Sequence, residues 1–257
     1  MHQIRKKLLL LGSDNPTTWI VYNHLVQNFG LFEAIIERPI PRVRLIRNRL
    51  RKLGLIKVID QLAFVIALRP LLLRRFNKRI REIARTQNLE MIRPISQAIH
   101  NIESVNSDEC RALIANFKPD IIIVNGTRII GKKTMQATNA TFINTHHGIT
   151  PVYRGAHGAY WALYQNDLPN CGVTIHLIDE GIDTGNIIHQ TLISPTKADC
   201  FVTYPYLQTA AALPLLCQSI REASEGKLQT KPISGQSSIW YHPGLFQYLA
   251  GLWRGIV

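Results

Sequence analysis

The chain has 257 residues, of which 46% are apolar, and a formal net charge of +13. A chain of this length can bury a substantial core, so we predict a single domain over 1–257, with an insertion at 41–86 and a C-terminal extension at 226–257. No run of 18 uncharged apolar residues occurs, and the apolar run at 8–11 is too short for a signal sequence. We therefore expect neither a membrane-spanning helix nor a signal peptide.

The positive charge is concentrated in one segment. Residues 41–85 contain 14 Lys and Arg against two acids, Asp60 and Glu82, whereas the rest of the chain carries about +1. This distribution argues against a surface-wide nucleic-acid interface. Three interpretations of the segment stay open: helices that pack on the domain and expose arginine to water, a dock for a membrane surface or an anionic substrate, and a nucleic-acid arm.

The cysteines and histidines show no metal-ligand spacing. Cys110, Cys171, Cys200 and Cys217 are scattered, and no His-x-x-x-His cluster occurs, so we expect no bound metal. Buried or free thiols are typical of a reducing compartment, which predicts a cytoplasmic protein. Peripheral contact with the inner membrane surface through 41–86 is the alternative. The sequence leaves the oligomeric state open, a homodimer included.

Strand and helix patterns alternate along the chain. In order, the expected elements are a strand at 7–11, a helix at 17–28, a strand at 31–37, two or three helices over 42–85 with an interruption at Pro70, a short strand at 90–93, a helix at 107–117, a strand at 121–125, a short helix at 132–138, a strand at 140–144, a helix at 158–166, strands at 172–178 and 186–192, and helices at 200–223 and 243–256. The uninterrupted apolar run at 121–125 is typical of a central parallel strand. The pattern predicts an α/β fold with a mostly parallel, Rossmann-like twisted sheet, a basic helical insertion and a C-terminal helical tail.

A turn follows the first strand at Gly12, Ser13 and Asn15. Asn15 or Thr17 is expected near the N-cap of the next helix, with Pro16 in its first turn. Because a helix N-terminus can hold an anion, this turn is a candidate substrate-binding loop. A plain strand–helix connection is the alternative, since no Gly-x-Gly-x-x-Gly pattern occurs.

Polar residues capable of chemistry follow two later strands. Asn144 and His146 are two positions apart, and alternate side chains share one face of a strand, so both can point into one cleft. His147 should face the opposite way. Asp183 lies on a turn-like segment, from which its carboxylate could raise the basicity of an imidazole and fix its orientation. An amide, an imidazole and a carboxylate together suit acyl-transfer chemistry.

Over roughly residues 110–193 the chain resembles the folate-dependent formyltransferase family. The resemblance rests on an ordered set of motifs: Asn144-x-His146, Pro151-x-Tyr153-Arg154-Gly155, Gly172-Val173-Thr174-x-His176 and Asp183-x-Gly185-x-Ile187. It implies the formyltransferase fold and transfer of a formyl group from 10-formyltetrahydrofolate, a co-substrate, to a primary amine.

The resemblance also implies roles for individual residues. The catalytic set would be Asn144, His146 and Asp183. The residues expected to contact the pterin of the co-substrate are Arg128, Ile129, Ile130, Asp179, Glu180 and Gly181. The residues expected to contact the acceptor are Gly12, Ser13, Asn15, His147, Tyr153, Arg154 and Gly155. His176 is expected to serve packing and hydrogen bonding.

The sequence departs from the family beside the amine site, where His147 stands for the commoner Pro and Gly148 for Ser. Together with the basic insertion, this departure favours a nucleotide-linked or phosphorylated small amine, an amino sugar foremost. Three alternatives stay open: a phosphoribosylglycinamide formyltransferase, a hydrolase that releases formate from formyl-folate, and a non-catalytic protein that binds a membrane surface.

Overall fold

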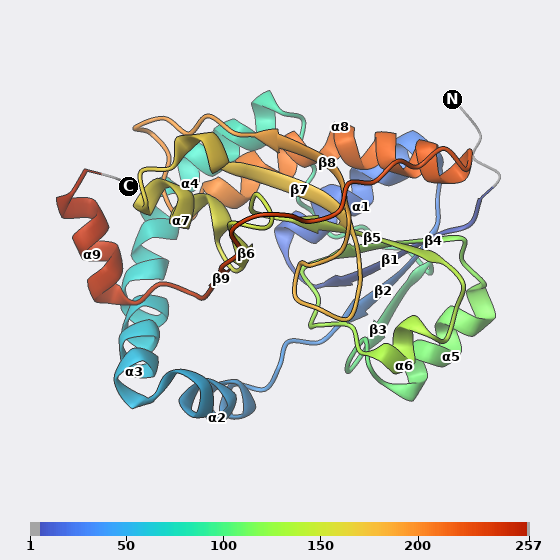
Figure 1. Cartoon of the computed structure of the whole chain (residues 1–257), viewed down its shortest axis with the longest axis horizontal. Helices are drawn as coiled ribbons and strands as arrows, with labels where there is room; N and C mark the ends of the chain where they lie inside the picture. Colours follow the sequence, from blue (N-terminus) through green and yellow to red (C-terminus); the bar gives the residue numbers. More distant parts are fainter. Residues whose placement is uncertain (1–5, 256–257) are drawn as a thin grey trace.

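The computed structural model describes residues 6–255, and its centre is a seven-stranded sheet (Figure 1). The strand order is β3-β2-β1-β4-β5-β7-β8. The strands are β1 (Leu8–Ser13), β2 (Glu33–Glu37), β3 (Ile99–Ile102), β4 (Ile121–Asn125), β5 (Thr141–His146), β7 (Gly172–Leu177) and β8 (Ile187–Leu192). Strands β1 to β5 pair in parallel, and β7 pairs antiparallel with both β5 and β8. The mostly parallel α/β fold predicted from the sequence is confirmed.

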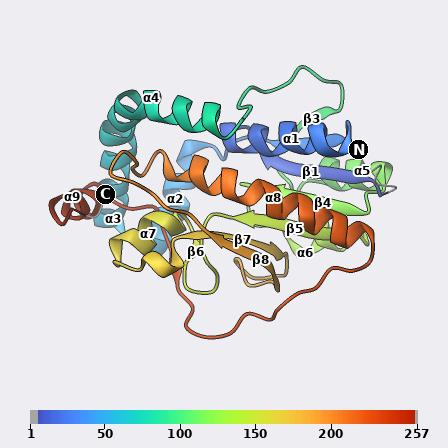
Figure 2. The same cartoon turned by 90° about the horizontal axis from the view of Figure 1, so that it is seen from above.

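Helices cover both faces of this sheet (Figures 1 and 2). The helices α1 (Pro16–Phe29) and α8 (Tyr204–Ser224) lie on one face, and α5 (Asp108–Phe117) and α6 (Lys132–Met135) lie on the other. Leu8 and Leu10 share a core with α1 and α8, whereas Leu9 and Leu11 share one with α5. Because successive side chains of a strand point to opposite faces, the uninterrupted leucine run is what a strand buried on both sides requires.

Two helix starts are capped by side chains, and one of these caps is the Asn15 expected from the sequence. Asn15 Oδ1 accepts a hydrogen bond of 3.1 Å from the Thr18 N–H at the start of α1. Ser107 Oγ accepts one of 3.1 Å from the Cys110 N–H at the start of α5. Each cap supplies a partner to an N–H that the helix itself leaves unpaired.

The basic residues lie on a helical arm that extends from the sheet (Figure 1). The arm comprises α2 (Arg42–Leu53), α3 (Leu55–Ala63), a π turn (Phe64–Leu68) and α4 (Arg69–Thr86). Pro70 lies in the first turn of α4, where its missing N–H is tolerated, and the π turn carries the chain into that helix. No helix in the described range is both long and apolar enough to cross a membrane.

A second core joins the arm to the sheet and to the C-terminal helix α9 (Leu245–Trp253). The ring of Phe64 contacts the rings of Phe201 and Tyr248 at centroid distances of 4.9 and 5.3 Å. The helix α7 (Gly158–Tyr164) contributes Tyr160 and Trp161 to this core. A short parallel pair, β6 (Arg154–Gly155) with β9 (Ile239–Trp240), lies beside α7.

The prediction of a strand at 90–93 is wrong. That segment has no strand, and the edge strand next to β2 is β3, which begins at Ile99. The Asn23 amide donates to the carbonyls of Glu90 and Ile92 at 3.0 and 2.8 Å, so a side chain satisfies this backbone in place of a neighbouring strand. The pair β6–β9 was not expected either, because two-residue strands leave no period in a sequence.

A buried ion pair fastens α4 to the segment before α8. Arg79 Nε and Nη2 donate to the two carboxylate oxygens of Asp199 at 2.9 and 3.1 Å, and the Asp199 side chain is fully buried. Burial alone would raise the pKa of Asp199, but the bonds from Arg79 and Thr196 outweigh it and lower the pKa. Removing the guanidinium would leave a buried carboxylate without its charged partner.

We therefore predict that Arg79→Met lowers the free energy of unfolding by about 3 kcal/mol. The measurement is urea denaturation at neutral pH, with Arg75→Met on the exposed side of the same helix as the matched control. Equal stabilities of the two variants would show that this ion pair does not anchor the arm.

Candidate active site

A pocket of about 590 Å³ lies beyond the C-terminal ends of β4 and β5. Ligands of open α/β sheets bind at this edge, and the volume suits a small organic molecule. Asn144 and His146, at the end of β5, both line the pocket, as expected from their alternate positions. Strand β7 pairs with β5 so that His176 lies opposite Asn144. The register of one antiparallel pair therefore brings three polar side chains to one wall.

Asn144 is held by His176. The Asn144 Nδ2 and His176 Nε2 atoms are 3.0 Å apart, and His176 Nδ1 is 2.6 Å from the carbonyl oxygen of Leu177. Because that carbonyl can only accept, the neutral His176 ring donates through Nδ1 and accepts the Asn144 amide at Nε2. One N–H of the carboxamide is engaged in this way, and the second is left for a ligand in the pocket.

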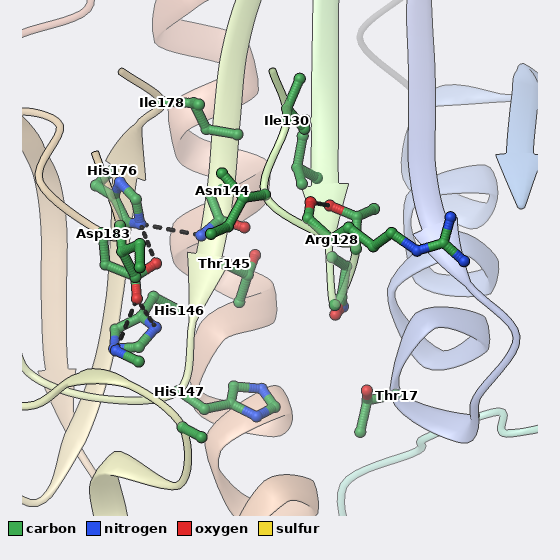
Figure 3. Close-up of a pocket in the computed structure, with 18 of the residues that line it drawn as sticks. Thr17, Arg128, Ile130, Asn144, Thr145, His146, His147, His176, Ile178 and Asp183 are labelled. Atoms are coloured by element: carbon green, nitrogen blue, oxygen red, sulfur yellow. Dashed lines mark hydrogen bonds and ion pairs between the residues drawn. The ribbon is translucent and has the colours of Figure 1, made fainter. Parts of the chain in front are cut away.

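His146 lies between two acceptors. Its Nε2 donates to the carbonyl oxygen of Tyr153 at 2.7 Å, and its Nδ1 is 3.3 Å from a carboxylate oxygen of Asp183. Figure 3 shows His146, His176 and Asn144 gathered around Asp183. A neutral imidazole has one N–H and satisfies only one of these acceptors, whereas a protonated ring would satisfy both. The arrangement therefore suits a histidine that takes up a proton during a reaction.

The resting charges of this pair are set by burial and by each other. Burial lowers the pKa of His146 and outweighs the opposing influence of Asp183 and of the Tyr153 carbonyl. Burial would raise the pKa of Asp183, but His146, His176 and the Gly155 N–H more than offset it and lower that pKa to about 2. At neutral pH the site thus holds a carboxylate beside a neutral imidazole, which is the pairing that general-base chemistry needs.

The Asp183 turn has a demanding backbone. Asp183 itself has φ of +49°, a left-handed conformation that is uncommon for residues other than glycine. Its Oδ2 accepts a bond of 2.9 Å from the Gly155 N–H. A Cβ at Gly185 would come within 1.8 Å of the carbonyl oxygen of Leu177, so only glycine lets this turn close against the end of β7.

Gly148 has a similar steric role beside His146. A Cβ there would come within 2.3 Å of the Tyr153 carbonyl oxygen and 2.7 Å of His146 Nε2. The glycine therefore lets the chain fold back so that this carbonyl reaches the imidazole. The departure from the family pattern at this position thus has a local physical reason.

His147 also lines the pocket, so the expectation that only one of the adjacent histidines reaches the cleft is wrong. The strand ends at His146, and the chain turns there, so strict alternation no longer applies. The Thr209 hydroxyl of α8 lies 3.2 Å from His147 Nε2 and holds the ring in place.

The loop after β4 forms the opposite side of the pocket. The buried Glu37 carboxylate accepts a bond of 2.5 Å from the Arg128 N–H and fixes the loop. The Arg128 side chain extends away from Asn144 and donates to the carbonyl oxygens of Glu103 and Arg38 at 2.8 and 2.6 Å (Figure 3). The loop therefore offers the pocket its backbone and the side chains of Ile129 and Ile130.

The structure brings most of the predicted site residues to one pocket, but not all. Those that line it are Arg128, Ile129, Ile130, Asn144, His146, His147, Gly155, Asp179, Gly181 and Asp183. Those outside the lining are Gly12, Ser13, Asn15, Tyr153, Arg154 and Glu180. Lining residues that sequence reasoning missed include Thr17, Ile178, Ile182, Pro205 and Gln208. Pro205 and Gln208 begin α8, far along the chain, and no local pattern could reveal their approach.

The residues outside the lining hold the walls in place. Ser13 Oγ donates to the Gly126 carbonyl at 2.7 Å. Arg154 binds the Ile182 carbonyl and the Ser237 hydroxyl at 2.8 and 2.6 Å, and Glu180 pairs with Lys132 at 2.9 Å. The Tyr153 ring is buried, and its hydroxyl donates to Asp167 at 2.8 Å.

Thiols and metal ligands play no visible part in this pocket. All four cysteines are buried and free of disulfides. Among residues 6–255, no group of three or more His, Cys, Asp or Glu side chains is arranged to hold a metal ion.

Comparison with known proteins gives the same picture. Residues 79–204 match the family model described as Formyl transferase. The methionyl-tRNA formyltransferase of Chlorobium chlorochromatii is 33% identical over 113 residues, which cover 40% of this chain and 36% of that protein. The GDP-perosamine N-formyltransferase of Brucella melitensis is 30% identical over 124 residues, 48% of each chain. The chain thus spans between a third and a half of the length of these curated relatives.

The fold is also similar to that of solved formyltransferases. The structure of the N-formyltransferase from Helicobacter canadensis, in complex with folinic acid and dTDP-3-aminofucose, aligns with a TM-score of 0.53 at 14% identity. The alignment covers 90% of this chain and 70% of that one. At this identity the likeness establishes the fold, and it extends well beyond the segment that matches in sequence.

We predict that acidification destabilises the protein through four buried histidines, three in the pocket and His242 beside His157. Burial lowers the pKa of His146 and His157, and lowers those of His147 and His242 to about 4. As the pH falls below about 6.5, the unfolded chain binds protons that the folded protein does not. Stability should therefore be fully present above pH 6.5 and fall by up to about 1.4 kcal/mol per pH unit for each such histidine.

Urea denaturation between pH 7 and pH 5 measures this slope. The variant His147→Asn should show a shallower dependence than the unaltered chain, because it removes one of the four groups. A free energy of unfolding that stays constant across this range would contradict the assignment of neutral, buried histidines.

Proposed function

Because the chain belongs to the formyltransferase family, we propose that it transfers a formyl group from 10-formyltetrahydrofolate to the primary amine of a small substrate. The acceptor we favour is nucleotide-linked or phosphorylated, an amino sugar foremost. The observation that carries the proposal is the meeting of the Asn144 carboxamide, the His146 imidazole and the Asp183 carboxylate on one wall of the pocket. These groups supply an oxyanion donor, a base and a charge that stabilises the protonated base.

The folate would lie between the catalytic wall and the loop after β4. The pocket volume of about 590 Å³ accommodates a pterin. The loop at Arg128–Ile130 presents main-chain groups and two isoleucines, which suit a flat heterocycle with an edge of donors and acceptors. Asp179 and Gly181 border the same pocket. The Helicobacter canadensis enzyme, which shares this fold, is the one solved with folinic acid.

The chemistry follows from the free N–H of Asn144. The neutral amine attacks the formyl carbon, a new C–N bond forms, and the carbonyl oxygen becomes an oxyanion that accepts from Asn144 Nδ2. His146 takes the proton that the amine must lose, and its imidazolium charge offsets that of the oxyanion. Asp183 stabilises the imidazolium.

The second half of the reaction returns the proton. When the bond between the formyl carbon and N10 of the folate breaks, the proton passes from His146, through water, to that nitrogen. The products are a formamide and tetrahydrofolate, so neither an oxidant nor a metal ion is needed to balance the step. Holding both reactants in one pocket supplies a further share of the rate, because positioning alone can contribute several kcal/mol.

Water in place of the amine would convert the same site into a hydrolase, and glycinamide ribonucleotide would make it an enzyme of purine synthesis. One assay distinguishes these outcomes. The protein is incubated with 10-formyltetrahydrofolate and a panel of amino-sugar nucleotides, glycinamide ribonucleotide and simple amines, while tetrahydrofolate release and product mass are followed. Formamide formation only with an added amine supports transfer, whereas formate release without any amine indicates the hydrolase. No folate turnover under any condition contradicts the proposal.

We predict that Asn144→Ala lowers turnover by about 10²- to 10³-fold, because an oxyanion donor is lost. Steady-state assays with the amine identified in the panel measure the effect. The matched control is Asn28→Ala on α1, whose side chain bonds the His24 carbonyl and does not line the pocket. Near-normal turnover in a folded Asn144→Ala protein would remove the role assigned to this residue.

We predict that Asp183→Asn, which keeps the side-chain shape and tolerates the left-handed backbone, lowers turnover at least about 100-fold. The variant loses the charge that stabilises protonated His146. The pH dependence of turnover is measured alongside, since a purely structural role for Asp183 would lower activity without changing that profile.

A further inference from the structure

A second pocket, of about 570 Å³, adjoins the active-site pocket on the side of the basic arm. The two pockets share Ala156 and His157, which follow the Gly155 that holds Asp183. A ligand whose reactive end lies near Asn144 can therefore extend past these residues into the second pocket.

The second pocket is strongly cationic. Arg49, Arg51 and Lys52, near the end of α2, line one side of it. A helix C-terminus favours cations, which explains part of their presence. Yet within the described residues none of the three forms an ion pair with a carboxylate.

Arg49 is the most constrained of these cations. It is half-buried, and its contact in the structure is a bond of 3.4 Å to the Gln61 amide oxygen. Holding a guanidinium away from water without a counter-charge costs free energy, and a bound anion would offset that cost. His157 and Tyr241 add polar groups on the other sides of the pocket.

We propose that this cationic pocket binds the phosphate or diphosphate of the acceptor substrate while its amine lies beside Asn144. The inference rests on the proposed function, which it deepens by naming the anionic part of the substrate and the residues that hold it. Guanidinium groups match phosphate oxygens in bidentate geometry, and lysine adds a point charge. In this proposal the basic arm supplies the cationic part of the acceptor site, which the sheet does not provide.

The test is titration calorimetry with inorganic pyrophosphate, which requires no folate and no turnover. The combined variant Arg49→Gln, Arg51→Gln and Lys52→Gln should weaken binding at least about tenfold. The control Arg44→Gln removes an exposed charge from the same helix outside the pocket and should change affinity less than about twofold. Equal weakening by both variants, or no binding by the unaltered protein, overturns the site.

Two further ligands identify the source of the phosphate. UDP represents a soluble nucleotide-linked acceptor, and geranyl diphosphate represents a prenyl-linked one. The ligand that binds more tightly than pyrophosphate, and whose binding is lost in the combined variant, identifies the class of the acceptor substrate. The binding test and the activity assay can fail separately. Pyrophosphate binding without formyl transfer would contradict the proposed activity but support the anion site. Formyl transfer without pyrophosphate binding would support the activity but contradict the anion site.

A second inference rests on a different surface, the outer face of α3 and α9. The two helices lie side by side at the far end of the arm (Figures 1 and 2), and Asp60 Oδ1 of α3 accepts a bond of 3.0 Å from the Phe246 N–H of α9. Their outward side chains are apolar and exposed, with Ile56, Phe246 and Trp253 at 85%, 73% and 91% exposure. The other exposed members are Leu55, Ile59 and Leu249.

We infer that this face, the α3–α9 face, inserts into the interface of an anionic lipid bilayer. Lys57 and Arg254 flank it, and the arm as a whole carries the excess positive charge of the chain. Apolar side chains that dip below the headgroups, surrounded by Lys and Arg, are what peripheral membrane helices present. Charge complementarity thus favours an anionic membrane over a second copy of this basic chain, which would repel it.

Vesicle sedimentation tests this inference. Vesicles that contain phosphatidylglycerol should pellet the protein, whereas pure phosphatidylcholine vesicles and high salt should not. The variant Phe246→Ser with Trp253→Ser should lose most of the binding, while Ile95→Ser, an equally exposed residue before β3, should keep it. Equal binding by both variants overturns the inference. If the unaltered protein does not bind vesicles but is a dimer in light scattering, and the double variant is a monomer, the face serves self-association instead.

Discussion

The active-site wall depends on one short contact region, where a backbone N–H and two imidazole rings converge on the carboxylate of Asp183. The Gly155 N–H donates to it at 2.9 Å, and His146 and His176 lie 3.3 and 3.6 Å from its oxygens. Each of these groups comes from a different segment, and the antiparallel pairing of β5 with β7 sets their spacing. A carboxylate so surrounded stays ionised, and it keeps the adjacent imidazole oriented toward the pocket.

This arrangement explains why several nearby positions are glycine. Gly185 allows the Asp183 turn to close on β7, and Gly148 allows the Tyr153 carbonyl to reach His146. The parallel half of the sheet then supplies a rigid edge, and the loop after β4 supplies the opposite wall. The basic arm and α9 lie outside this frame and share their own aromatic core. The two binding roles that we propose for the arm therefore do not depend on the residues of the Asn144, His146 and Asp183 wall.

Much of the fold could be predicted because its signals are local. The buried strands Leu8–Ser13 and Ile121–Asn125 are continuous apolar runs, and the caps Asn15 and Ser107 mark helix starts. The alternate positions of Asn144 and His146 at the end of β5 predicted that both side chains share one face. Features that depend on distant contacts could not be found in this way. The strand predicted at 90–93 is replaced by hydrogen bonds from Asn23, and Gln208 reaches the pocket from the start of α8.

In the mechanism that we propose, the free N–H of Asn144 faces the formyl oxygen of a bound folate. A crystal structure of the protein with folinic acid tests it most directly, because the formyl group and the carboxamide would be seen together. We expect the pterin to lie against the Arg128–Ile130 loop, with a distance of about 3 Å between Asn144 Nδ2 and the formyl oxygen or the site that this oxygen would occupy after attack. A folate bound elsewhere, or a formyl group directed away from Asn144, His146 and Asp183, would contradict it.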